Sequence, residues 1–244
     1  MVPAETDAPS GTVTFLFTDI EDSTGLWERE PVGMQAALAV HDRLVQDLVA
    51  GHGGYVFAAT LDGFAAAFDR PESAMEAAIA AQGAIGEHDW PLAGGPIRVR
   101  MGLHTGTAVE RDGNYFGPAV NLAARVMGTA AGGQVLVSAA CAGLLSSAVM
   151  DVELEPAGRL ALAGIAHPVD VHVVVAEGLV TEVATAADGP RRSAADLPRY
   201  STSFVGRTAE MSGLAEELGR SGLVTVVGAG GMGKTRLVVE TPTS

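Results

Sequence analysis

Lysine is almost absent from this chain. Its 244 residues hold a single lysine, Lys234, beside 14 arginines, so no lysine in the first 233 positions can serve catalysis or form a basic arm. Acidic side chains outnumber basic ones by 29 to 15, which gives a formal net charge of -14. Such a balance disfavours a broad electrostatic surface for DNA, RNA or an anionic membrane. We therefore expect no nucleic-acid partner.

Cysteine, long apolar runs and leader features are scarce as well. The single cysteine, Cys141, excludes an internal disulfide and fits a reducing compartment. No stretch of 18 apolar residues predicts a membrane-spanning helix, and residues 1–11 have neither the basic nor the apolar region of a signal peptide. No Cys/His cluster indicates a zinc site. These absences predict a cytoplasmic protein without a membrane segment.

The order of predicted elements indicates a fold class. β-branched and aromatic runs predict strands, and apolar residues at helical spacing predict helices. Strands are expected at 12–18, 54–60, 63–69, 97–107 and 134–138, helices at 23–50 (broken near Pro31), 71–88 and 117–127, and a late hairpin at 152–162 and 169–176. This order predicts an α+β protein with a ferredoxin-like βαββαβ core and an accessory C-terminal β-hairpin.

Composition divides the chain into four segments. Residues 1–11 are expected to be a disordered N-terminus, and 12–176 a folded domain. Residues 177–202 are rich in Ala, Thr, Pro, Asp and Arg with little periodicity, which is typical of a linker. Residues 203–244 then predict a short helix, a strand and a glycine loop.

Two aspartates stand where strands end. Asp19 follows the first strand, and Asp62 lies in the turn between the second and third strands. In a ferredoxin-like sheet these places can be neighbours. Converging carboxylates repel each other, and a divalent cation relieves that repulsion; oxygen ligands favour Mg²⁺ or Mn²⁺. Taken singly, Asp19 could instead cap a helix and Asp62 could be an ordinary turn residue.

Five blocks, in order, resemble the catalytic domain of class III nucleotide cyclases, the adenylate and guanylate cyclases. The blocks are FTDIEDST (17–24), HGGYVFAATLDGF (52–64), RVRMGLHTG (98–106), YFGPAVNLAARVM (115–127) and GGQVLVS (132–138). The resemblance is strongest to actinobacterial cyclases and covers about residues 11–176. It implies a βαββαβ core and active sites that lie between the two subunits of a homodimer.

The resemblance also implies roles for individual residues. Asp19 and Asp62 match the aspartates that hold two Mg²⁺ or Mn²⁺ ions, and Ile20 matches a position whose backbone carbonyl contacts metal. Asn121 and Arg125 match the pair that the other subunit contributes to position the ribose and stabilise the transition state. Their i, i+4 spacing places them on one face of a helix.

Three positions depart from the family pattern. Ala58 stands where the family has a purine-binding lysine, and Asn114 stands at the second purine-reading position. The amide of asparagine can still bond a purine edge, whereas alanine offers no polar group. Leu61 stands where glycine commonly precedes the second aspartate; if the backbone there needed positive φ, leucine would be strained by about 1–2 kcal/mol.

A second nucleotide motif lies near the C-terminus. Residues 228–235 form a complete GxxxxGK[ST] loop after a predicted strand at 223–227. In such a loop Gly228 and Gly233 allow backbone N–H groups to approach phosphates, Lys234 reaches the β- and γ-phosphates, and Thr235 can bind Mg²⁺. The segment SFVGRTAE (203–210) resembles the start of AP-ATPase signalling domains. Few residues follow the loop, so we expect a truncated, non-functional P-loop start.

These observations predict a homodimeric adenylate cyclase that converts ATP to cyclic AMP and pyrophosphate by two-metal catalysis. The eroded purine contacts predict weak activity or relaxed purine selectivity, with GTP as the other candidate substrate. The alternative is a catalytically degenerate, cyclase-like module that dimerises and senses nucleotide. An ATPase at the P-loop would need residues that follow the loop in complete domains.

Overall fold

A computed structural model of the chain describes residues 8–145, 152–165, 167–182, 206–221, 237–238 and 241. The chain divides into two compact units, residues 1–189 and 190–244. In the second unit the structure describes one helix of 14 residues, α6 (Thr208–Ser221). The P-loop positions Gly228, Gly233, Lys234 and Thr235 lie outside the described residues.

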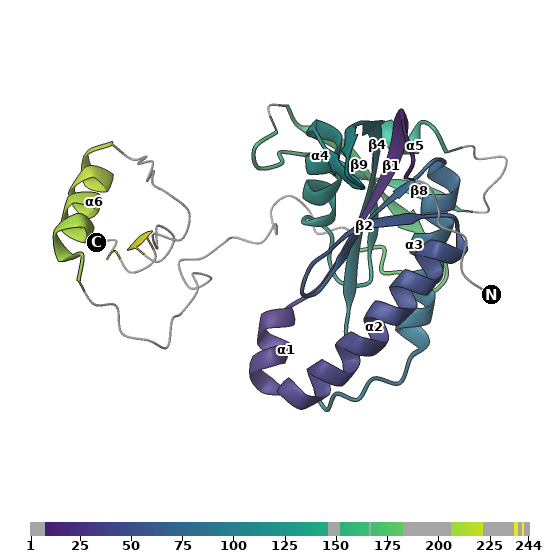
Figure 1. Cartoon of the computed structure of the whole chain (residues 1–244), viewed down its shortest axis with the longest axis horizontal. Helices are drawn as coiled ribbons and strands as arrows, with labels where there is room; N and C mark the ends of the chain where they lie inside the picture. Colours follow the sequence, from purple (N-terminus) through teal and green to yellow (C-terminus); the bar gives the residue numbers. More distant parts are fainter. Residues whose placement is uncertain are drawn as a thin grey trace. The chain divides into compact units, whose positions relative to one another are not determined.

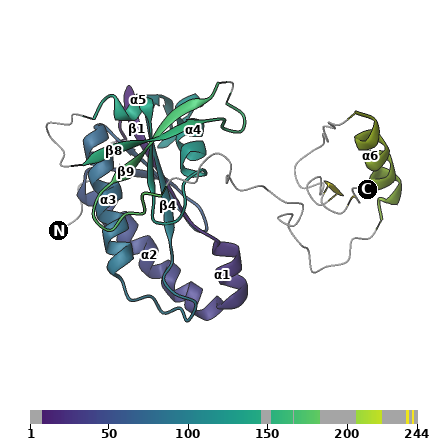
Figure 2. The same cartoon turned by 180° about the vertical axis from the view of Figure 1, so that it is seen from behind.

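A seven-stranded sheet forms the centre of the first unit (Figures 1 and 2). Its strand order is β2-β3-β1-β4-β7-β9-β8, and every neighbouring pair is antiparallel except β4 with β7. The strands are β1 (Thr12–Ile20), β2 (Tyr55–Ala59), β3 (Phe64–Phe68), β4 (Val99–Thr107), β7 (Val135–Ser138), β8 (Glu153–Leu160) and β9 (Val169–Val175). The order β2-β3-β1-β4 is that of a ferredoxin-like core, and the β8–β9 hairpin extends it. The predicted α+β fold class is confirmed.

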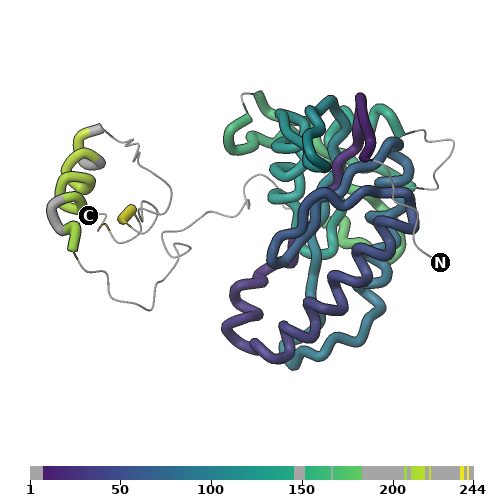
Figure 3. The backbone as a smooth tube through the Cα atoms, in the orientation of Figure 1, coloured from purple at the N-terminus to yellow at the C-terminus, as the bar shows by residue number. Residues whose placement is uncertain are grey.

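Helices cover both faces of this sheet. Helices α2 (Pro31–Gly51) and α3 (Pro71–Glu87) run side by side across one face, and the short α1 (Ser23–Arg29) precedes α2 (Figure 3). The four-residue α5 (Ala139–Ala142) follows β7 and contributes Cys141 to the same apolar cluster as α2 and α3. Helix α4 (Pro118–Met127) packs on β4, β1 and β7 with a separate set of buried side chains.

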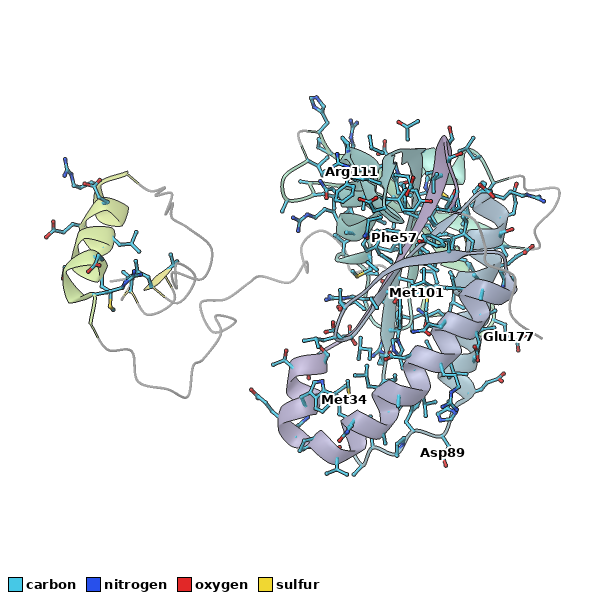
Figure 4. All side chains as sticks on the ribbon, in the orientation of Figure 1. Met34, Phe57, Asp89, Met101, Arg111 and Glu177 are labelled. Atoms are coloured by element: carbon cyan, nitrogen blue, oxygen red, sulfur yellow. The ribbon has the colours of Figure 1, made fainter. Side chains whose placement is uncertain are left out.

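Alternation along β1 creates two cores. Leu16 and Ile20 belong to the cluster beneath α2 and α3, together with the labelled Met34 and Met101 (Figure 4). Val13 and Phe15 belong to the cluster beneath α4. Successive strand residues point to opposite faces, so a strand covered on both sides is apolar along almost its whole length. The same is true of β3, whose sequence FAAAF is buried throughout.

The sequence patterns did not predict one small hairpin, which lies outside the main sheet. Strands β5 (Val109–Arg111) and β6 (Asn114–Phe116) form a separate two-stranded sheet. They are joined by Asp112 and Gly113, whose φ angles are 53° and 76°. Two positive φ values are the requirement of a type I′ turn, and Asp-Gly is a preferred sequence for it. The signal was therefore present in the sequence, but the flanking strands are only three residues long.

The ends of the first unit are anchored to the sheet. The Tyr115 hydroxyl on β6 donates a hydrogen bond to the Pro9 carbonyl oxygen at 2.6 Å. After β9, the backbone N–H of Val180 donates to Gly133 O at 3.0 Å, and the Gln134 side chain donates to Glu182 O at 2.6 Å. Within the described part of the chain, no helix combines the length and apolar character that crossing a membrane requires.

The single cysteine provides a test of this packing. Cys141 is fully buried, and burial raises the pKa of its thiol to about 11. Because the thiolate is the reactive form, we expect a thiol reagent at mildly alkaline pH to modify the folded protein at least about 100-fold more slowly than the denatured protein. Absorbance of the released thiolate dye in native buffer and in guanidinium chloride measures this ratio. Equal rates would show that α5 does not pack on the sheet.

Candidate active site

The turn between β2 and β3 packs against the end of β1. The backbone N–H of Ile20 donates to Asp62 O at 3.0 Å, and the N–H of Phe64 donates to the Thr18 hydroxyl at 3.0 Å. Asp62 also contributes to the electrostatic environment of Asp19. The structure therefore brings together the three predicted metal-site positions, Asp19, Ile20 and Asp62.

Only glycine fits at position 63, because the turn approaches the backbone of β1 closely there. A Cβ atom built on Gly63 would overlap the carbonyl oxygen of Thr18 and would lie 3.1 Å from the Cα of Asp19. The backbone conformation of Gly63 is not left-handed, so the constraint is the close approach of two chain segments. This approach sets the position of the turn, and with it Asp62, relative to Asp19.

Arg100 is the immediate partner of Asp19. The two residues stand directly opposite each other on β4 and β1. The Arg100 Nε donates to Asp19 Oδ2 at 2.7 Å, and Nη2 donates to the same oxygen. Oδ1 takes part in neither bond, so its lone pairs remain available to another ligand.

Burial makes Asp19 harder to ionise than an ordinary aspartate. Only 18% of its side chain is exposed, and burial raises its pKa. The hydrogen bond and charge of Arg100 oppose that rise, and the nearby Asp62 adds to it. A positive charge brought between the two carboxylates would favour the ionised form of both.

The Asp62 carboxylate has a different partner. The Ser23 hydroxyl, at the start of α1, donates to Asp62 Oδ2 at 2.5 Å. The Thr60 hydroxyl lies 3.4 Å from Oδ1 and 3.1 Å from Gly63 O, so its better hydrogen bond is to the backbone. As with Asp19, one carboxylate oxygen is engaged by a protein donor and the other is not closely held.

These residues fit a hard divalent cation. Two carboxylates of adjacent segments supply oxygen ligands, which Mg²⁺ and Mn²⁺ prefer, and such ions retain water and bind phosphate oxygens. Among the described residues no group of three or more His, Cys, Asp or Glu side chains could hold a metal. The pair therefore suits an ion that completes its coordination with backbone, water or substrate oxygens.

Leu61 is not strained. Among the described residues other than glycine, positive φ occurs only at Asp22, Asp112 and Arg207. The strain considered for leucine at this turn is therefore absent, because the four-residue loop from Thr60 to Gly63 makes the bend without a left-handed residue at 61. The Leu61 side chain is 86% exposed instead.

A buried histidine lies behind the site. His41 on α2 has no exposed surface, packs its ring against Phe64 at 5.8 Å between centroids, and places Nδ1 3.0 Å from Asp42 Oδ1. Its Nε2 has no hydrogen-bond partner. Burial lowers the pKa of His41, so the ring is neutral at neutral pH and acts as part of the core.

Asn121 and Arg125 lie elsewhere in the same chain. Both side chains are exposed on α4, one turn apart, on the face of the sheet opposite α2 and α3. In the part of the chain that the structure describes, no hydrogen bond or ion pair joins either residue to Asp19 or Asp62. Exposure on one helical face is compatible with a role toward another molecule.

The two predicted purine positions are accessible to different degrees. Ala58 is half-buried on β2, the outermost strand beside β3, next to a register shift between Val56 and Ala58. Asn114 is exposed as the first residue of β6. Near them, Phe57 packs edge-on against Phe15 and Tyr115, and Figure 4 labels it at the middle of the unit.

Sequence reasoning missed two residues of this site. Arg100 lies within the block RVRMGLHTG (98–106) on the strand paired with β1, and strand pairing could have placed it opposite Asp19. Ser23 follows the first aspartate by four positions, and its partner lies 39 residues away. Nothing in the local sequence indicates that distant contact.

Comparison with known proteins gives consistent results. A sequence profile described as "Adenylate and Guanylate cyclase catalytic domain" matches residues 6–176. An uncharacterized protein of Mycobacterium tuberculosis is 36% identical over 207 residues, covering 84% of this chain and 70% of that protein. The adenylate cyclase of Lachancea kluyveri is 35% identical over 154 residues, covering 53% of this chain and 8% of that protein.

Solved structures show the same likeness. An adenylate cyclase from Trypanosoma brucei in its monomeric state is 28% identical with a TM-score of 0.63, covering 71% of this chain and 92% of that one. The adenylate/guanylate cyclase/hydrolase from Silicibacter pomeroyi is also 28% identical, with a TM-score of 0.62, covering 68% of this chain and 98% of that one.

The close approach at Gly63 leads to a stability prediction. We expect Gly63→Ala to lower the free energy of unfolding by more than about 2 kcal/mol, because the added methyl group forces the turn away from β1. Gly83→Ala is the matched control, since a Cβ at that helical position meets nothing within 4 Å. It should stabilise the protein by about 0.5–1 kcal/mol. Chemical denaturation measures both, and equal effects would contradict the close approach.

Proposed function

Because the chain belongs to the adenylate and guanylate cyclase catalytic domain family, we propose that it is an adenylate cyclase that converts ATP to cyclic AMP and pyrophosphate. The observation that carries the proposal is the convergence of Asp19 and Asp62, each with one oxygen engaged by a protein donor. The proposed enzyme is a homodimer in which each site combines residues of both subunits.

In the proposed reaction, the ribose 3′-oxygen of ATP forms a bond to the α-phosphorus. The bond to pyrophosphate breaks, and the hydroxyl proton passes to water. Asp19, Asp62 and the Ile20 carbonyl would hold two Mg²⁺ or Mn²⁺ ions, whose charge would favour loss of that proton and neutralise the triphosphate. Arg100 orients Asp19 through its hydrogen bonds, and its charge favours the ionised carboxylate against the burial that raises the pKa of Asp19.

The remaining chemistry is assigned to α4 of the partner subunit. Asn121 would orient the ribose, and Arg125 would donate hydrogen bonds to the charge that develops on the phosphoryl oxygens. Their exposure on one face of α4 supports this assignment, because a second copy can approach them. On this assignment an isolated chain is inactive, because each site needs α4 of a second copy.

Base recognition is proposed to be weak. Ala58 supplies no hydrogen bond to the purine, and Asn114 can bond either adenine or guanine through its amide. ATP is the proposed substrate, with GTP as a competitor of similar affinity.

The second candidate is a degenerate cyclase module that dimerises and binds nucleotide without turnover. Ala58 favours it, because alanine offers no polar group to the purine. Thermal stabilisation by ATP and Mn²⁺ without formation of any cyclic product would favour this candidate over the enzyme.

Mixing two inactive variants tests both the activity and the shared site. Asp62→Ala and Arg125→Ala should each lose nearly all formation of cyclic nucleotide from ATP with Mn²⁺. In an equal mixture about half of the dimers are mixed, and each has one intact site, so activity should return to about a quarter of wild type. Chromatography of the cyclic product measures this recovery. No product from wild type above Asp19→Ala would refute the enzyme, and no recovery in the mixture would refute the shared site.

Restoring a base contact tests the proposed recognition. We expect Ala58→Lys to raise kcat/KM for the better nucleotide at least about 10-fold, because a charged hydrogen bond contributes about 1.5–3 kcal/mol. Ala59→Lys, one residue further along the same strand, is the matched control and should give no gain. Steady-state rates with ATP and with GTP measure both variants. A gain from the control, or none from Ala58→Lys, would contradict the assignment of position 58.

A further inference from the structure

We propose that Ser23 is a positioning residue for Asp62, holding its carboxylate so that one oxygen faces the metal. The proposal rests on the function proposed above, because it concerns a ligand of that same site. Its basis is the 2.5 Å hydrogen bond from the Ser23 hydroxyl to Asp62 Oδ2, which joins two segments 39 residues apart.

The backbone directs Ser23 toward the turn. Asp22, the second residue after β1, adopts a left-handed conformation with φ 52° and ψ 33°. This conformation bends the chain sharply, so the first residue of α1 returns toward the β2–β3 turn. The side chain of Asp22 itself bonds Arg29 at 2.9 Å, away from Asp62. The Asp22 carboxylate is therefore engaged by an arginine of its own helix.

Ser23 does not serve as a helix cap. The N-cap position of α1 is Asp22, and no side chain caps the helix through a hydrogen bond. A serine at the start of a helix commonly bonds a free backbone N–H. Here its hydroxyl donates to a carboxylate in another segment, which is a charge-assisted bond.

The hydrogen bond from Ser23 fixes the orientation of the Asp62 side chain, which the backbone of the turn does not restrain. The Ile20 N–H donates to the carbonyl oxygen of Asp62, but that backbone contact does not restrain the Asp62 side chain. Thr60, at 3.4 Å from Oδ1, is a weak restraint. Ser23 therefore determines which oxygen of Asp62 points toward α1 and which remains available. Arg100 does the same for Asp19, where both donors reach Oδ2.

Metal affinity measures this role directly. We expect Ser23→Ala to weaken Mn²⁺ binding about 10-fold, because loss of a bond that orients a metal ligand typically costs 10- to 100-fold. Ser23→Thr retains the hydroxyl and should bind as wild type does. Ser73→Ala is the matched control, since it makes the same change in the first turn of α3. Electron paramagnetic resonance of free Mn²⁺, with and without a non-cyclisable ATP analogue, measures affinity without turnover.

A double-mutant cycle separates positioning from a general structural effect. In an Asp62→Ala background, Ser23→Ala should cause no further loss of Mn²⁺ affinity, because the group it orients is gone. An equal loss in both backgrounds, or unchanged affinity in Ser23→Ala alone, would overturn the proposal. Failure of the proposed function gives a different result: wild type would form no cyclic product above Asp19→Ala, while Ser23→Ala would still bind Mn²⁺ more weakly than wild type.

Discussion

The backbone contact between the β2–β3 turn and the end of β1 determines the geometry of the whole site. Gly63 lies so close to the Thr18 carbonyl that no side chain fits, and the Ile20 N–H bonds the carbonyl of Asp62. Two carboxylates from segments more than 40 positions apart are thereby held near each other without touching. The backbone hydrogen bonds and packing of the sheet offset the mutual repulsion of the two carboxylates.

The electrostatics of the site depend on arginine because lysine is nearly absent. Arg100 offers a planar group whose Nε and Nη2 reach one oxygen of Asp19 from the opposite strand. A guanidinium stays charged in a partly buried place, where an ammonium group loses its proton more readily. The burial that raises the pKa of Asp19 is thus opposed by a guanidinium that stays protonated.

Local patterns predicted the elements and the two aspartates, but contacts between distant segments required the structure. Runs of apolar and β-branched residues located β1, β3 and β4, and helical spacing of apolar residues located α3. The conformation of Leu61 depends on the loop closing over four residues, which no single residue type indicates. The bonds of Ser23 and Arg100 depend on strand pairing. In the proposed homodimer, the relation of Arg125 to the carboxylates depends on a second copy, which one sequence does not describe.

Strand β3 restricts which amino-acid substitutions the protein can accept. Its five residues are all buried, with layers packed on both faces, so even one added methylene would press on a helix or on the aromatic cluster. This strand begins directly after Gly63, so a buried segment without functional side chains fixes the position of the turn that carries Asp62. Ala58 lies on the edge strand and is only half-buried. A substitution at this edge can therefore change the side chain at position 58 while Asp19 and Asp62 keep their relative positions.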